Sequence, residues 1–489
     1  MNRIAYIAAN YFFIVFLVFI LARNLIQAQE VLKSPHNTIE IDKALEGFDD
    51  NGLSDEHNEE IDEALSGFDG EWGEYETTES IDTVQESYFY DLTGSSGLGV
   101  SYNFTHDPPD STQADYRCLS RLRTKLNLEL KLRFSDAWSA LISGKGFYDF
   151  AYIIKGRGEF TEKTLNLYER ELELGETYFQ GSLLSNLDVK IGRQIAVWGR
   201  SDNIRVVDVI NPMDNREPGV VDIEDLRLPV TMTRVDYYYD KWNLSALSVH
   251  EMRLNKNPVY GSDFYSMPVD LKEKAPANII DNTEYALAVN GIFTGWDISF
   301  YLARFYDDKP NLQGELSGME LHHSRLTMAG LSVNVVKGNL LFKIESAYFY
   351  GMKYYALPDK RASRFDLLAG LEYSGFSDTV ISLEAVNRHL FDYESRMQEM
   401  PDSTQEDDFQ TVLRCNKDLM NDTLHLTILA SIIGITDDGG GFERYSIEYD
   451  VIDAFSILAG IIFYRSGDRI LFRNINDKDR FFFEAKYSF

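Results

Sequence analysis

The chain has 489 residues, of which 44% are hydrophobic and 13% aromatic, and its formal net charge is −31. A mean hydropathy of −0.27 excludes a bundle of apolar membrane helices. The acidic balance argues against nucleic acid as a partner, because phosphate binding needs a basic surface. Abundant aromatic residues with unremarkable hydropathy are typical of a membrane β-barrel, whose apolar exterior and polar interior alternate along each strand.

The first 28 residues resemble a secretory signal peptide. Arg3 precedes a long apolar run over residues 4–22, and Ile26-Gln27-Ala28 resembles a cleavage site. An uncleaved inner-membrane anchor is the alternative, because about 20 apolar residues can span a bilayer. No similar run follows, so any later membrane-spanning segment has to be a strand.

Residues 29–90 form an acidic arm that carries 19 Asp or Glu against 2 Lys or Arg. Such a segment buries too little apolar surface to offset the entropy of folding, so we expect it to be disordered in the periplasm. Residues 41–49 recur at 61–69 with seven of nine positions identical, and each copy could place three apolar side chains on one side of a short helix. These candidate docking residues for a periplasmic protein or exporter are Ile41, Leu45, Phe48, Ile61, Leu65 and Phe68. A duplicated acidic spacer is the alternative interpretation.

From residue 91 to the end, the sequence alternates apolar and polar residues, most clearly over residues 121–134. Side chains of a strand alternate between its faces, so this segment is expected to have one apolar and one wet side. Its length exceeds the 5 to 6 residues usual in soluble strands and suits a tilted membrane-spanning strand, although a soluble sandwich could also produce it. The residues expected to face the lumen are Arg121, Arg123, Lys125, Glu129, Lys131 and Arg133.

Similar segments recur along the chain and predict an all-β fold, a transmembrane antiparallel β-barrel of about 16–18 strands over residues 91–489. Short turns at 240–241 and 337–338 alternate with long polar connections near 253–282, 306–324, 351–364 and 389–408. Further strands are expected near 138–152, 165–180, 187–197, 229–239, 242–252, 283–292, 296–305, 325–336, 339–350, 365–373, 379–388, 409–416, 423–434, 442–449, 455–464 and the C-terminus.

The last nine residues are the most specific signal for location. Residues 481–489 alternate aromatic or apolar with mostly polar positions, and the chain stops at Phe489. This segment resembles the C-terminal strand that the barrel-insertion machinery recognises in outer-membrane proteins. We therefore expect the protein to lie among outer-membrane lipids of a Gram-negative bacterium.

One stretch differs from its surroundings. A strand ending in Gly192-Arg193-Gln194 leads through Trp198-Gly199 to Ile210-Asn211-Pro212 and Asp214. Here the sequence resembles the domain-of-unknown-function 1302 family of Gram-negative outer-membrane proteins. The resemblance implies a porin-like barrel, and since members often accompany inner-membrane exporters, it suggests transport of hydrophobic or other small solutes. The acidic arm is not part of this resemblance.

The roughly thirty residues after Arg200 mix apolar residues with arginines, and this content argues against disorder. We expect this loop to fold into or across the barrel and narrow it, because a barrel of about 16 strands otherwise encloses an open channel. A surface loop held by its own apolar cluster is the alternative. The candidate residues for the constriction or for fixing the loop are Arg193, Trp198, Arg200, Asn211 and Asp214.

A second lumen-facing group is acidic and consists of Glu169, Glu171 and Glu173. It belongs to the second strand after the basic face of residues 121–133, so the two faces are expected about 10 Å apart on one wall. Opposed charges of this kind create a transverse field that favours polar, oriented solutes. Mutual compensation of the charges is the alternative.

The sequence offers no candidate catalytic group, cofactor site or metal site. Its eight histidines are scattered, and no phosphate-binding loop or dinucleotide motif occurs. The residues Cys118 and Cys415 permit one disulfide without implying it. We therefore expect a channel or conduit and not an enzyme, the alternative being a barrel that binds or anchors a periplasmic partner without transport.

Overall fold

The structure is a computed structural model that describes residues 89–489 except for 110–113, 222–224, 268, 315–317 and 435–437. The predicted signal peptide (1–28) lies outside the described residues. So do the six candidate docking residues and all of the arm (29–90) except its last two residues. These expectations therefore stay predictions.

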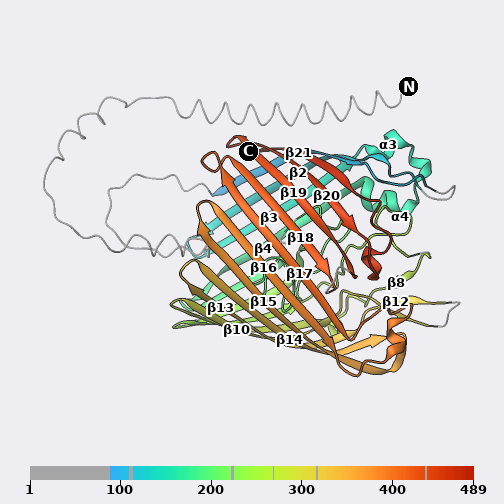
Figure 1. Cartoon of the computed structure of the whole chain (residues 1–489). Coiled ribbons are helices and arrows are strands. Elements are labelled where there is room, and N and C mark those ends of the chain that lie inside the picture. The colour runs from blue at the N-terminus through green and yellow to red at the C-terminus, as the bar shows by residue number, and fades with distance from the viewer. Residues whose placement is uncertain (1–88, 110–113, 222–224, 268, 315–317, 435–437) are drawn as a thin grey trace, which may run out of the picture. The chain divides into compact units, whose positions relative to one another are not determined.

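The described chain forms an antiparallel β-barrel that closes where β21 pairs with β1 (Figure 1). The predicted fold class is confirmed, and the barrel sheet has 18 strands, at the upper end of the expected range. Its strands are β1 (Tyr90–Asn103), β2 (Cys118–Ser135), β3 (Trp138–Asp149), β4 (Arg170–Leu184), β5 (Leu187–Gln194), β6 (Val230–Tyr239), β7 (Trp242–Val249), β9 (Glu284–Phe293), β10 (Trp296–Tyr306), β13 (Arg325–Lys337), β14 (Leu340–Tyr354), β15 (Leu357–Phe376), β16 (Thr379–Leu390), β17 (Asp407–Leu419), β18 (Leu424–Ile433), β19 (Gly440–Ile452), β20 (Phe455–Arg465) and β21 (Arg480–Ser488).

The remaining elements are short and belong to the connections. Three strands form a separate small sheet, β8 (Lys272–Lys274), β11 (Asn311–Gln313) and β12 (Glu320–His322). Within the described ranges, none of the helices has the length and apolar content needed to cross a bilayer. The helical segments are α3 (Ala151–Lys155), η1 (Arg157–Glu159), α4 (Glu162–Thr164), η2 (Leu165–Glu169), η3 (Ile280–Asn282), η4 (Ser395–Gln398) and η5 (Ile470–Phe472).

The alternation of residue types decides which side of each strand faces inward. On β4, Leu172 and Leu174 are 92% and 51% exposed, whereas Glu171 and Glu173 point to the interior and bind cations there. Because apolar side chains are stable only away from water, this outer surface suits a lipid environment. The two-residue period of the sequence thus gives the barrel an apolar exterior and a polar interior.

Short turns and long connections alternate along the chain, as expected, but one connection was wrongly predicted. Residues 351–364 are not a long loop, because β14 continues to Tyr354 and β15 begins at Leu357. The ladder between them extends through Met352 paired with Ala362, so the polar residues in this region belong to a protruding hairpin. Polarity alone did not distinguish such a hairpin from a loop.

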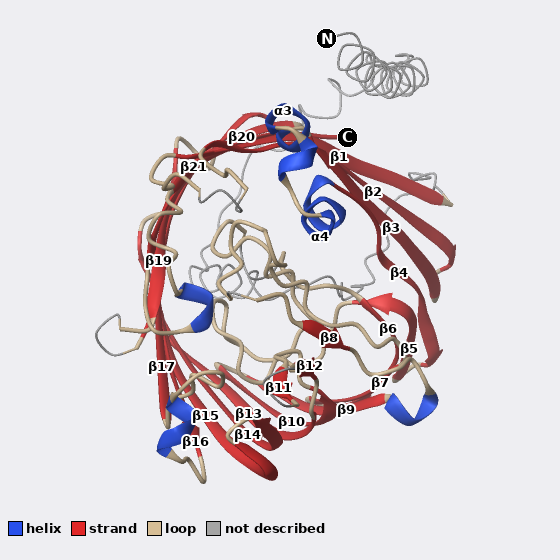
Figure 2. Cartoon of the chain, turned by 90° about the vertical axis from the view of Figure 1, so that its right-hand side faces the viewer, coloured by secondary structure: helices blue, strands red, loops and turns tan. Residues whose placement is uncertain are grey.

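The start of the strand expected at 165–180 and the end of the strand expected at 187–197 also differ from the prediction. The first begins at Arg170, because residues 165–169 form η2. The second ends at Gln194, since the backbone N–H of Ile195 leaves the ladder and donates to Glu176 Oε1 (2.8 Å). From this point the chain turns into the barrel, and Figure 2 shows loop segments crossing the interior of the ring of strands.

Candidate functional site

The first part of the 195–229 loop packs against the inner wall of the barrel. Trp198, Val207 and Ile210 are at most 7% exposed and belong to one apolar cluster with inward-facing residues of β6 to β18. The Trp198 ring lies 5.0 Å from that of Tyr301 on β10. The loop therefore lies inside the barrel, where its apolar residues fill part of the lumen.

Two inward-facing carboxylates of the wall bind the backbone of this loop. Glu345 on β14 accepts the backbone N–H groups of Arg200 and Ser201, the latter at 2.8 Å. Glu384 on β16 accepts those of residues 202 and 203 at 2.9 and 3.0 Å, and also the Ser201 hydroxyl at 2.7 Å. Four consecutive N–H groups thus point at two buried carboxylates, an arrangement suited to binding negative charge. We call Glu345 and Glu384 the anchoring pair.

Arg200 adds a third attachment to the wall. Its Nε donates to Asp297 Oδ1 on β10 at 2.9 Å. Lys343 on β14, only 5% exposed at its side chain, pairs with Asp202 of the loop. Charge-assisted bonds of this kind are roughly twice as strong as neutral ones, so the loop is held firmly on the β10 to β16 side.

Asn211 ties the two ends of the loop together. It is fully buried, accepts the backbone N–H of Ala196 at 2.8 Å, and donates to the carbonyls of Gln194 (3.2 Å) and Leu228 (2.9 Å). Just beyond it, Met213 and Arg227 form an antiparallel bridge. The two ends of the segment between Met213 and Arg227 therefore lie side by side. We call residues 215–221 of this segment the tongue.

The tongue reaches across to the opposite wall. Glu217 lies 2.9 Å from Arg121 and 3.5 Å from Arg123, both on β2. Arg216 lies 2.6 Å from Glu171 on β4 and is also bound by Asp214 at 2.5 Å. These ion pairs connect the loop to strands that are distant from the anchoring pair.

The tongue also contacts β19 and β20. The Tyr464 hydroxyl donates to the carbonyl of Pro218 at 2.7 Å. Gly219 has a φ of +77°, and a Cβ atom there would lie 2.8 Å from the ring of Phe442. A glycine is thus needed at this close approach, and the tongue spans the lumen between several walls.

The loop between β7 and β9 supports the same region. Lys256 pairs with Glu171 and Glu173, and Arg253 pairs with Glu173. Farther along, Asp263 is bound by Arg480 (2.8 Å) and Lys478 (3.1 Å). Two loops therefore bind the charged side chains of this region, of which the sequence analysis singled out one.

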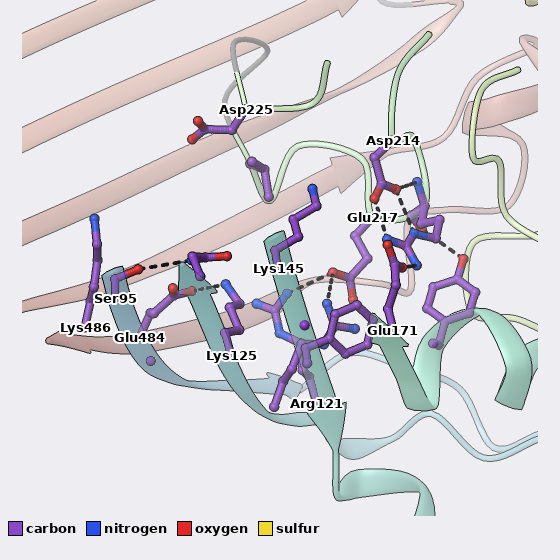
Figure 3. Close-up of a pocket in the computed structure, with 18 of the residues that line it drawn as sticks. Ser95, Arg121, Lys125, Lys145, Glu171, Asp214, Glu217, Asp225, Glu484 and Lys486 are labelled. Atoms are coloured by element: carbon purple, nitrogen blue, oxygen red, sulfur yellow. Dashed lines mark hydrogen bonds and ion pairs between the residues drawn. The ribbon is translucent and has the colours of Figure 1, made fainter. Parts of the chain in front are cut away.

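A cavity of about 420 Å³ remains between the tongue and the wall formed by β21 and β1 to β4 (Figure 3). Its lining is dominated by charged side chains, most of them paired across elements. Lys125, for example, lies 2.6 Å from Glu484 on β21. The cationic lining residues are Arg121, Arg123, Lys125, Lys145, Arg216 and Lys486, and the anionic ones are Glu171, Asp214, Glu217, Asp225 and Glu484.

Glu217 carries its charge in a partly buried position. Burial opposes its ionised form, but the positive charges of Arg121, Arg123 and neighbouring arginines outweigh that effect and lower its pKa to about 2. The carboxylate therefore stays ionised over the whole neutral range and keeps the tongue attached to β2.

The structure places the other predicted residues as follows. Arg193 is part of β5 and binds Glu251 at 2.9 Å, so it holds the end of β7 and not the loop itself. Glu169 does not belong to the acidic face, because it lies in η2 and pairs with Arg157 at 2.7 Å. Lys131 pairs with Glu129 at 3.4 Å, and neither these residues nor Arg133 line the cavity.

Sequence reasoning missed the anchoring pair and the tongue charges Arg216 and Glu217. The available signal was weak: Lys343 and Glu345 on β14, and Glu384 with Arg388 on β16, are the few charged residues on strand faces that are otherwise apolar or small. Cys118 and Cys415 are both free thiols in the structure.

Comparisons with known proteins agree with this architecture. The family model described as "Protein of unknown function (DUF1302)" matches residues 110–489, whereas the comparison with curated proteins gave no match. OccAB4 of Acinetobacter baumannii has 10% identity, a TM-score of 0.50, and coverage of 82% of this chain and 98% of its own. A BenF-like porin from Pseudomonas fluorescens Pf-5 has 12% identity with the same TM-score and coverage. At such identities the likeness shows a shared porin-like fold.

Proposed function

The chain belongs to the DUF1302 family of proteins of unknown function, and from its architecture we propose that it is an outer-membrane channel for the diffusion of small polar solutes. One observation carries the proposal: the 195–229 loop crosses the interior of a closed barrel and leaves a charged cavity beside it. A loop that narrows a wide barrel gives size selection without closing it.

The chemistry of the cavity favours polar over hydrophobic solutes. Charged side chains line both the strand wall and the tongue, and stripping water from them to admit an apolar molecule would cost free energy. Ions and small polar molecules can replace part of that hydration. No step of this process requires a catalytic group, and we infer that the protein is not an enzyme.

We further propose that the protein resides in the Gram-negative outer membrane, inserted through its C-terminal strand. The apolar outer face of the strands and the porin-like fold support this location. Coupling to an inner-membrane exporter through the acidic arm is a separate proposal, supported only by the duplicated apolar pattern at 41–49 and 61–69.

The channel is tested by single-channel recording of the purified protein in planar bilayers. The critical variant replaces residues 215–225 with Asn-Gly, a two-residue turn that can join the bridged Met213 and Arg227 segments. The buried apolar part of the loop stays intact, so the barrel should fold. We expect discrete current steps from the wild type and larger steps from the variant.

Two results would count against the proposal. A folded wild-type barrel that gives no current steps would favour a non-transporting barrel that binds or anchors a partner. Equal steps from wild type and variant would show that the tongue does not limit the passage. A Glu448→Gln variant is a suitable control, because this β19 residue does not line the cavity.

A further inference from the structure

We propose that the cavity contains a binding site for small dianions, formed by the side chains of Lys145 on β3 and Lys486 on β21. The inference rests on the proposed channel function and deepens it by naming a solute class. It follows from the way in which the other charges of the cavity are already paired.

Most lining charges neutralise one another. Arg121 and Arg123 share Glu217, and Lys125 lies 2.6 Å from Glu484. Arg216 is bound by both Glu171 and Asp214. These pairs leave little charge to attract a solute, because each cation already has a carboxylate in contact.

Lys145 and Lys486 are different. Both line the cavity, and in the described part of the chain neither forms an ion pair or a side-chain hydrogen bond. Asp225 is the lining carboxylate without an ion pair in that same part, and it belongs to the segment leading back from the tongue. Among the described lining residues, the charges without an ion pair are therefore two ammonium groups on the strand wall and the carboxylate of Asp225.

The strand register puts the two lysines within reach of one solute. Lys145 pairs with Asn127, Asn127 with Ser95, and Lys486 with Gly97 on the same strand as Ser95. Three strand spacings and the two-residue offset from Ser95 to Gly97 separate the two lysines, which is about 16 Å along the wall. Figure 3 shows both lysines extending from the wall on the same side. Their long, flexible side chains can shorten this gap.

The wall between the lysines is polar. The Lys125–Glu484 ion pair lies over Gly97, where a Cβ atom would be 3.7 Å from Glu484 Oε1, and beside it the Asn127 amide donates to the Ser95 hydroxyl at 3.1 Å. A solute can therefore lie along the wall with an anionic group at each lysine and hydrogen-bonding groups beneath it. Each ammonium supplies three donors, so a solute with two anionic groups satisfies both lysines at once, whereas a monoanion satisfies one.

The test measures dianion binding with sulfate and succinate, which represent compact and extended dianions, and with acetate as a monoanion. Binding to the purified full-length protein in detergent is followed by calorimetry at about 0.1 M salt, where charges are screened over about 10 Å. Block of the single-channel current gives a second readout. Calorimetry stays informative even if the protein does not conduct, so failure of the channel proposal and failure of this one are distinguishable.

We expect Lys145→Gln and Lys486→Gln each to weaken binding of at least one dianion roughly fivefold, and that of acetate roughly twofold, from the loss of one charge about 5 Å from the solute. Stronger binding of succinate than of sulfate would mean that one molecule bridges both lysines, and the reverse would mean that they close around a compact ion. Lys337→Gln, at the exposed end of β13, should leave binding unchanged. Absence of dianion binding to the wild type, or wild-type affinity in both cavity variants, would overturn the proposal.

Discussion

The anchoring pair provides the sharpest test of how the loop is held inside the barrel. Changing both Glu345 and Glu384 to Gln preserves the shape of the side chains but removes both negative charges. In the wild type these carboxylates accept four backbone N–H groups and the Ser201 hydroxyl. Each Gln keeps one acceptor oxygen. Its amide N–H₂ replaces the second oxygen and cannot accept a hydrogen bond from the backbone N–H groups of the loop.

The expected weakening follows from these bonds. A hydrogen bond to a charged group contributes about 1.5–3 kcal/mol, and Gln retains part of the acceptor capacity. Losing one such bond at each site weakens the attachment by about 3–6 kcal/mol. Because about 1.4 kcal/mol is a factor of ten in a population, the fraction of barrels with a released loop should rise at least a hundredfold.

The assay is single-channel recording combined with limited proteolysis of the 195–229 loop. The double variant should show frequent transitions to a larger conductance and faster cleavage of the loop, while the barrel itself remains resistant. Glu448→Gln makes the same substitution at an inward-facing position of β19 that lies beyond the tongue contacts of Phe442 and Arg444, and should behave like the wild type. If the double variant shows as few conductance transitions and as slow a cleavage of the loop as the wild type, the carboxylates do not hold the loop and the reasoning is refuted.

Two further predictions concern the tongue and the base of the loop. Because the pKa of Glu217 is lowered from 4.5 to about 2, its stabilisation is complete above pH 4.5 and is lost as the pH falls through 2, so conductance should rise over that interval. Glu217→Gln should show the raised conductance already at neutral pH without an acid-induced step, and an identical acid response in this variant would contradict the assignment. Asn211→Asp loses two buried N–H donors, to the carbonyls of Gln194 and Leu228, at about 1–3 kcal/mol each. Protease should then cut the loop faster in Asn211→Asp than in wild type, and equal rates would exclude a clamping role for Asn211.

Much of the fold could be predicted from the sequence, because strand alternation is a local property. In β2 and β4 each residue type indicates its own side of the wall, as with Leu172 outside and Glu171 inside. Local composition also marked the 195–229 loop as unusual, because its apolar residues need a surface to pack on. Where local signals conflicted, the prediction failed: η2 displaced Glu169 from the acidic face, and a polar hairpin was taken for a loop at 351–364.

The partners of the charged residues could be decided only by the tertiary structure. The basic face of β2 was expected to oppose the acidic face of β4, yet Arg121 binds Glu217 of the tongue and Lys125 binds Glu484, 359 residues away across the closure of the barrel. Glu384 likewise binds backbone groups more than 180 residues away. A sequence fixes which charges face the lumen through its local period. Which of them meet depends on where the loop crosses and where the barrel closes, and both result from packing of the whole chain.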